Sequence, residues 1–218
     1  MSRRTIVSLS LIAADQAHLG DAVQQAATWG VDRLHIDVED GTFTPRFGLS
    51  ARAVADLRPV SRLPFEAHLM VIEPERHARR FVEAGCESVA VHVEACPYLR
   101  RTVLLIREWG ASPGVALNPV TPLDSVEYAF DLIDRLVILT TEPDEAGEAF
   151  IPGMVDKVRQ ARELAANRPL EILVDGGVAP DNAAALLDLG ADGFVAGRAV
   201  WQAAHPSSVI SRLRAVKR

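Results

Sequence analysis

Cysteine is scarce in this sequence, which has only Cys86 and Cys96 in 218 residues. They form no C-x-x-C pair, and a chain of this length can bury a hydrophobic core without cross-links, so neither a disulfide framework nor a zinc knuckle is expected. Long apolar stretches are also missing: no run of about 18 apolar residues occurs, and no apolar signal region follows the N-terminal Met-Ser-Arg-Arg. These absences predict a soluble, cytoplasmic protein with no membrane partner.

The sequence has no excess of basic charge. It has 23 lysines and arginines against 29 aspartates and glutamates, for a net charge of −6. Because nucleic acids and anionic membranes attract basic surfaces, neither is expected as the main partner, and a small anionic substrate would need a local positive site. With 49% hydrophobic residues, the chain is long enough for one sizeable core and short for two ordinary domains, so we expect one domain over residues 1–218.

Short apolar, β-branched runs alternate with longer segments of helical periodicity along the chain. This alternation is typical of βα units around a parallel sheet, and eight units can be counted. The predicted fold class is therefore α/β, a single-domain (β/α)8 TIM barrel. The expected strands are Thr5–Leu11, Arg33–Glu39, Phe65–Val71, Ser88–Glu94, Pro113–Asn118, Leu136–Thr141, Glu171–Asp175 and Gly193–Ala196.

Glycine is absent from residues 11–15, which follow the first expected strand. A dinucleotide-binding open sheet needs a glycine-rich turn at this point, so that fold is not expected. Four glycines that close expected helices, Gly30, Gly85, Gly110 and Gly190, are separated by 55, 25 and 80 residues. These spacings are near multiples of about 27, one eighth of the chain, which indicates a repeated unit and favours a closed barrel.

Ionisable side chains gather near the ends of three expected strands. Because strand side chains alternate, His35, Asp37 and Glu39 share one face, and His68 and Asp175 lie near the ends of the third and seventh strands. Barrel active sites are built at these carboxyl ends. Two imidazoles and two carboxylates suit Zn²⁺, Fe²⁺, Co²⁺ or Mn²⁺, so His35, Asp37, His68 and Asp175 are candidate metal ligands. The alternative is that the inward histidines are ordinary core residues.

Glycine-rich segments follow the last two expected strands. Gly176 and Gly177 end the seventh strand and precede a helix, and Gly197 and Arg198 follow the eighth. Barrels commonly hold phosphate with backbone amides and a helix N-terminus at this position, and Arg198 adds a cationic donor. The alternative is that Gly176 and Gly177 only form a tight turn.

The motifs at these positions resemble those of the ribulose-phosphate 3-epimerase family over nearly the whole chain. The motifs that carry the resemblance are Ser10 with Ala14-Asp15, His35-x-Asp37-x-x-Asp40-Gly41-x-Phe43, His68-Leu69-Met70, His92-Val93-Glu94, Asn118-Pro119-x-Thr121-Pro122, Glu142-Pro143, Phe150-Ile151-Pro152 and Val174-Asp175-Gly176-Gly177-Val178.

The resemblance implies conversion of D-ribulose 5-phosphate to D-xylulose 5-phosphate by proton transfer through an enediolate. It implies that His35, Asp37, His68 and Asp175 bind one divalent metal ion (Zn, Fe, Mn or Co), and that Asp37 and Asp175 are also the acid–base pair. Substrate contacts would come from Ser10, His68, Gly176, Gly177, Gly197 and Arg198. Members of this family often assemble, so a homo-oligomer is a possible state.

Three departures from the family pattern concern the substrate. Glu39 stands where the family usually has methionine, Arg198 stands in place of a serine, and the glycine-rich loop after the sixth strand is acidic, with Glu142, Asp144 and Glu145. Two alternatives therefore stay open, an epimerase of another ketose phosphate such as allulose 6-phosphate and a non-catalytic sugar-phosphate-binding barrel. A metal-free decarboxylase is disfavoured, because the only lysines, Lys157 and Lys217, fall in expected helices.

Overall fold

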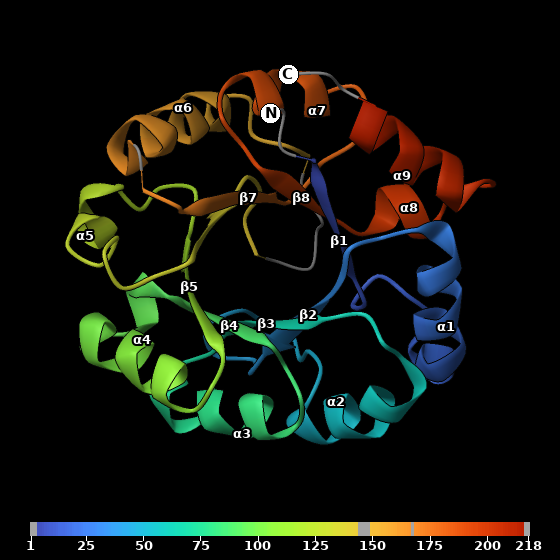
Figure 1. Ribbon diagram of the computed structural model, residues 1–218, viewed down its shortest axis with the longest axis horizontal. Helices are drawn as coiled ribbons and strands as arrows, with labels where there is room; N and C mark the ends of the chain where they lie inside the picture. Colours follow the sequence, from blue (N-terminus) through green and yellow to red (C-terminus); the bar gives the residue numbers. More distant parts are fainter. Residues whose placement is uncertain (1–3, 144–148, 167, 216–218) are drawn as a thin grey trace.

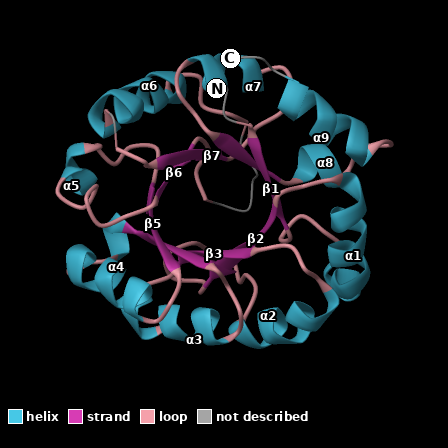
Figure 2. Ribbon diagram, in the orientation of Figure 1, coloured by secondary structure: helices cyan, strands magenta, loops and turns pink. Residues whose placement is uncertain are grey.

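Eight parallel strands close into a barrel in chain order and are surrounded by helices (Figures 1 and 2). The computed structural model describes residues 4–143, 149–166 and 168–215. The strands are β1 Ile6–Ser10, β2 Arg33–Glu39, β3 Phe65–Met70, β4 Ser88–His92, β5 Ser112–Leu117, β6 Arg135–Leu139, β7 Glu171–Asp175 and β8 Gly193–Ala196. The α-helices are α1 Leu19–Trp29, α2 Ala51–Leu57, α3 Ala78–Glu83, α4 Leu99–Glu108, α5 Asp124–Glu127, α6 Met154–Ala165, α7 Ala183–Asp188, α8 Arg198–Trp201 and α9 Pro206–Ala215.

The barrel predicted from the sequence is confirmed, and β2, β7 and β8 have the expected bounds. The fourth strand is shorter than expected, because the chain leaves β4 at His92 and forms a 3₁₀ turn over Val93–Ala95. The four glycines expected to close helices all have positive φ, between 82° and 108°. L-residues with a side chain rarely adopt this conformation, and it lets each helix end and the chain turn back toward the next strand.

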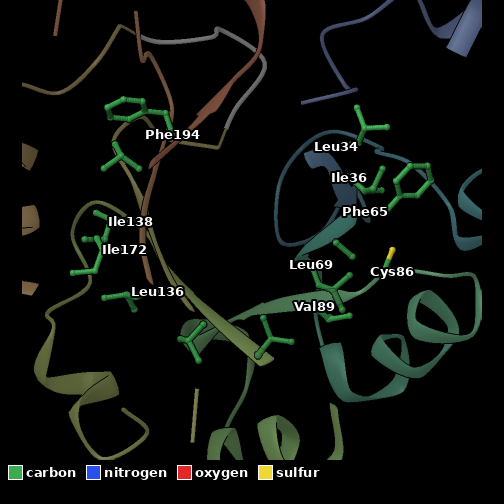
Figure 3. Close-up of a cluster of buried hydrophobic side chains, with 14 of the residues drawn as sticks. Leu34, Ile36, Phe65, Leu69, Cys86, Val89, Leu136, Ile138, Ile172 and Phe194 are labelled. Atoms are coloured by element: carbon green, nitrogen blue, oxygen red, sulfur yellow. The ribbon is translucent and has the colours of Figure 1, made fainter. Parts of the chain in front are cut away.

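The main hydrophobic core is a ring between the strands and the helices. Alternate strand residues face outward into this ring, and the helices cover them with their apolar faces. Figure 3 shows Leu34 and Ile36 of β2 beside Phe65 and Leu69 of β3, with Cys86 close by. Leu136, Ile138, Ile172 and Phe194 form the corresponding layer on the opposite side of the same view. Because outward positions are apolar, the polar residues at the intervening positions point into the barrel.

A charged network fills the barrel interior at the amino ends of the strands. Arg33 makes a bidentate ion pair with Glu171, at 2.6 and 2.8 Å. Arg135 contacts Glu171 at 2.7 Å, Glu66 at 3.0 Å and the Ser88 hydroxyl at 2.6 Å. Buried charges are tolerated when they are paired and hydrogen-bonded in this way. The network forms a rigid polar floor beneath the carboxyl ends of the strands.

Within residues 4–143, 149–166 and 168–215, every helix is too short or too polar to span a lipid bilayer.

Candidate functional site

Four predicted side chains meet inside the barrel at the carboxyl ends of β2, β3 and β7. The strand register pairs Asp37 with His68 on adjacent strands, and His35 lies one inward position below Asp37. Asp175 is the last residue of β7, and β8 and β1 separate its strand from β2. Each of these four residues has one possible ligand atom in a cluster whose atoms all lie within 4.8 Å of one another. The structure therefore brings together His35, Asp37, His68 and Asp175 from distant parts of the chain.

Hydrogen bonds to carboxylates fix the protons on two of the buried histidines. A carboxylate can only accept, so His35 Nδ1 donates to Glu66 Oε1 at 2.9 Å and His92 Nδ1 donates to Glu94 Oε2 at 3.0 Å. Burial lowers the pKa of His92 to about 4, so its ring is neutral and its Nε2 accepts. His68 Nε2, 2.9 Å from His92 Nε2, must then be the donor. Accordingly, His68 Nδ1 faces the cluster without a proton, as does Nε2 of a neutral His35.

The spacing of the acceptor atoms fits a small divalent cation. His35 Nε2 and His68 Nδ1 are 3.3 Å apart, and Asp175 Oδ2 is 3.5 Å from the first and 3.3 Å from the second. Asp37 Oδ1 is 3.6 Å from His35 Nε2. A tetrahedral site with bonds of about 2.0–2.2 Å places neighbouring ligand atoms about 3.3–3.6 Å apart. Four acceptors packed this closely repel one another unless a positive charge lies between them, so the residues present fit a metal ion.

The surroundings push the proton affinities of the two aspartates apart. Burial raises the pKa of Asp37, which the nearby Asp175 charge reinforces and His35 opposes. Burial alone would raise the pKa of Asp175 too, but contacts with His35 and His68 hold it well below its usual range. Burial opposes a charge on His35, yet Asp37, Asp175 and Glu66 raise its pKa well above the ordinary value. The same negative surroundings favour a metal ion, which competes with a proton for His35 Nε2.

A cavity of about 1080 Å³ opens directly above the cluster. Asp37 and Asp175 form part of its lining, and Ser10 on β1 reaches the same space, where its hydroxyl donates to Asp37 Oδ2 at 2.6 Å. The Trp201 indole donates to the Ser10 carbonyl at 2.7 Å and so ties the end of β1 to α8. His68 is fully buried and is not among the described residues that line the cavity, so its predicted substrate contact stays a prediction.

The predicted phosphate residues Gly176, Gly177, Gly197 and Arg198 line the other side of this cavity. The helix expected right after the glycine pair begins only at Ala183, so Gly176 and Gly177 lie in a turn, at φ 108° and 64°. Their close packing explains the need for glycine, because a Cβ on Gly177 would lie 2.7 Å from the Phe150 amide nitrogen. Gly197 directly precedes the short helix α8, as expected, and Arg198 is its first residue.

Several residues that shape the site were not given a role by sequence reasoning. Glu66, His92 and Glu94 orient the histidines, and of these only His92 and Glu94 belong to the motifs singled out in the sequence. Of the acidic residues after β6, Glu142 lines the cavity, whereas Asp144 and Glu145 lie outside the described residues.

Comparison with known proteins gives a consistent match over the chain. A family model described as the ribulose-phosphate 3 epimerase family matches residues 6–201. A ribulose-phosphate 3-epimerase of Synechocystis is 38% identical over 100% of this chain and 96% of that protein. The Bacillus subtilis protein of the same name is also 38% identical, over 97% and 99% of the two chains. A chloroplastic ribulose-5-phosphate-3-epimerase of Arabidopsis thaliana is 40% identical over 98% of this chain and 77% of that protein.

Solved structures with the same architecture are more distant in sequence. A 3-keto-L-gulonate-6-phosphate decarboxylase from Vibrio cholerae superposes with a TM-score of 0.72 and 19% identity, over 97% of this chain and 96% of that one. A 3-hexulose-6-phosphate synthase from Salmonella typhimurium gives 0.71 and 18%, over 97% and 98%. At this level of identity the likeness supports the barrel fold and says nothing about the reaction.

Proposed function

The chain belongs to the ribulose-phosphate 3 epimerase family, and we propose that it converts D-ribulose 5-phosphate to D-xylulose 5-phosphate. The observation that carries the proposal is the cluster of His35, Asp37, His68 and Asp175 beneath a cavity at the carboxyl ends of the strands. Purified protein supplied with D-ribulose 5-phosphate should form D-xylulose 5-phosphate, which a coupled transketolase assay measures. Absence of product from metal-loaded protein would contradict the proposal.

Asp37 and Asp175 are the proposed acid–base pair. Inversion next to a ketone requires removal of the C3 proton from one face of the substrate and return of a proton to the other face. The two carboxylates reach the cavity from strands on different sides of the cluster, β2 and β7. The reaction requires that one group of the pair starts protonated and the other ionised. The two groups exchange these roles in the reverse direction.

The proposed ligands of a Zn, Fe, Mn or Co ion are His35, Asp37, His68 and Asp175. When bound, such an ion supplies positive charge next to the substrate oxygens on which negative charge develops. The chain's own contribution is to hold the acceptors in place: Glu66 orients the His35 ring, and Ser10 orients the Asp37 carboxylate. The Asp175 main-chain carbonyl accepts from the Thr140 amide at 2.7 Å, which fixes the end of β7.

Arg198 is the proposed phosphate ligand, together with the amides near Gly177 and Gly197. Replacing it with serine should raise KM for the ketose phosphate at least about tenfold, with a smaller change in kcat, because the phosphate is remote from the reacting carbon. Steady-state kinetics measures both constants. Glu142 on the cavity wall is repelled by a phosphate, and an arginine in hydrogen-bond reach offsets that repulsion.

A matched control for the arginine variant is Arg52→Ser, because the Arg52 side chain is 83% exposed on α2 and pairs with Asp56. Its KM should equal that of the wild type. Should Arg198→Ser also keep the wild-type KM, the residue belongs to a surface ion pair and not to the substrate site. If unphosphorylated ribulose were turned over as fast as ribulose 5-phosphate, the proposed phosphate site would be wrong.

One observation favours a second candidate substrate, a ketohexose phosphate such as allulose 6-phosphate. Glu39 lines the cavity two positions beyond Asp37, and its Oε2 is buried without a hydrogen-bond partner in the part of the chain that the structure describes. Arg46 Nε lies 3.5 Å from that oxygen. A buried carboxylate oxygen gains from a hydroxyl donor, and a ketohexose phosphate carries one more hydroxyl than a pentulose phosphate.

This second candidate makes a quantitative prediction for Glu39→Met. If Glu39 binds the additional hydroxyl, the variant should lose at least about tenfold in kcat/KM for allulose 6-phosphate relative to ribulose 5-phosphate. Glu39→Gln keeps an acceptor oxygen at the same position, so its ratio should stay near that of the wild type. A ratio unchanged in both variants leaves the pentulose phosphate as the substrate. The possible homo-oligomer and the cytoplasmic location stay predictions.

A further inference from the structure

We propose that His92 and Glu94 are positioning residues that hold His68 in the tautomer whose Nδ1 carries no proton and can therefore bind a cation. His68 and His92 are fully buried, and their rings are nearly parallel, with an interplanar angle of 13°. Their Nε2 atoms are 2.9 Å apart, so one of the two must be the donor and the other the acceptor. The choice between them decides whether His68 can serve as a ligand. This inference rests on the metal site of the proposed function.

Glu94 determines which of the two histidines is the donor. Its Oε2 faces His92 Nδ1 at 3.0 Å and places the His92 proton on Nδ1. Nε2 of His92 then accepts from His68 Nε2, which leaves His68 Nδ1 facing Asp175 Oδ2 at 3.3 Å. If Glu94 did not accept from His92, the proton of each ring could move to its other nitrogen. His68 would then carry a proton on Nδ1, where it would block a metal ion.

The other oxygen of Glu94 is held just as firmly. Oε1 accepts from the Asn118 amide at 2.7 Å and from the Thr121 hydroxyl, both in the loop after β5. Although burial opposes the charge, hydrogen bonds from His92, and then from Thr121 and Asn118, lower the pKa of the Glu94 carboxyl to about 2. The carboxylate thus accepts from donors at both of its oxygens. A side chain with a donor group in place of either oxygen would leave one of these donors without an acceptor.

Lys157 anchors this loop from α6. Its Nζ donates to the main-chain carbonyls of Asn118 at 2.7 Å, Pro119 at 3.1 Å and Thr121 at 2.6 Å, which uses all three ammonium protons. The residue is 8% exposed and is not among the described residues that line the cavity, so its place is behind the loop. Lys157, the loop, Glu94 and His92 therefore form a continuous series of hydrogen bonds that ends at His68.

Glu94→Gln tests the inference sharply, because glutamine has the same shape but only one acceptor oxygen. The two donors at Asn118 and Thr121 should draw the amide oxygen to their side and turn the NH₂ group toward His92. His92 would then move its proton to Nε2, and His68 would carry one on Nδ1. Zinc affinity, measured by competition with a chromophoric chelator, should fall about 10–100-fold.

A second readout separates tautomer control from mere loop support. Long-range ¹H–¹⁵N spectra of the metal-free protein should show His92 protonated on Nδ1 in the wild type and on Nε2 in Glu94→Gln. The matched control is the exposed Glu83→Gln, whose zinc affinity should stay within about threefold of the wild type.

Two results would overturn the inference: wild-type His92 protonated on Nε2, or a zinc affinity of Glu94→Gln equal to that of the wild type. The wild-type spectrum decides the question even if the glutamine variant does not fold. Failure of the wild type to bind zinc would instead count against the metal site of the proposed function, and the tautomer of its His92 would still test the present inference.

Discussion

Replacing either Asp37 or Asp175 with asparagine should lower kcat by at least about 10³. An amide cannot accept the C3 proton or return one, and it also weakens the negative cluster that a cation requires. Both side chains line the cavity above the cluster, and both are largely buried, with exposed fractions of 9% for Asp37 and 15% for Asp175. The measurement is steady-state epimerisation in both directions, with bound metal determined on the same samples.

Asp56→Asn is the matched control for these variants, because Asp56 is exposed on α2, where it forms an ion pair with Arg52 at 2.8 Å. It should turn over at the wild-type rate. Near-normal turnover in one of the two cavity variants would exclude that residue as a proton carrier, and the two-carboxylate arrangement would then be wrong. Equal losses in both variants with metal retained would assign the loss to proton transfer.

His35→Ala and His68→Ala should each reduce bound metal from about one ion per chain to trace levels and abolish activity, while the barrel remains folded. Each variant removes a nitrogen donor from a set in which the remaining ligands are mostly carboxylate oxygens. Folding should survive the loss of His35, because Glu66 keeps its contacts with Arg135 and the Ser8 hydroxyl. Elemental analysis gives the metal content, and circular dichroism gives the fold.

The control for the histidine variants is His205→Ala, which removes an exposed imidazole ahead of α9. Its metal content should be that of the wild type. If both His35→Ala and His68→Ala kept the metal content of the wild type, these histidines would not be metal ligands, whatever the effect on activity.

Much of this architecture could be predicted from the sequence because it follows from local patterns. Alternation along β2 placed His35 and Asp37 on the inner face, and the structure packs the intervening Ile36 and Val38 into the outer core. Regular spacing of cap glycines indicated a closed barrel with eight units. Ligand types near the ends of three strands then indicated where a metal site would lie, since all strand ends meet at one rim of a parallel barrel.

The remaining features depend on contacts that periodicity does not encode. Arg33 and Glu171 are 138 residues apart, and each is at the start of a strand with nothing nearby to indicate a partner. Lys157 appears in the sequence only as a polar residue of a helix, yet its ammonium reaches the loop after β5, about 36–39 residues earlier in the chain. The direction of the His68–His92 hydrogen bond depends on Glu94, which lies in a turn where a strand had been expected.

The most direct test of the central claim is deuterium incorporation at C3. Metal-loaded protein incubated in D₂O with D-ribulose 5-phosphate should yield D-xylulose 5-phosphate that carries deuterium at C3, and the recovered substrate should acquire deuterium at the same carbon. These results are predicted because Asp37 and Asp175 exchange protons with solvent between turnovers. Tight binding of the sugar phosphate with no deuterium at C3 in either epimer would contradict the account and identify a barrel that binds the ketose phosphate without epimerising it.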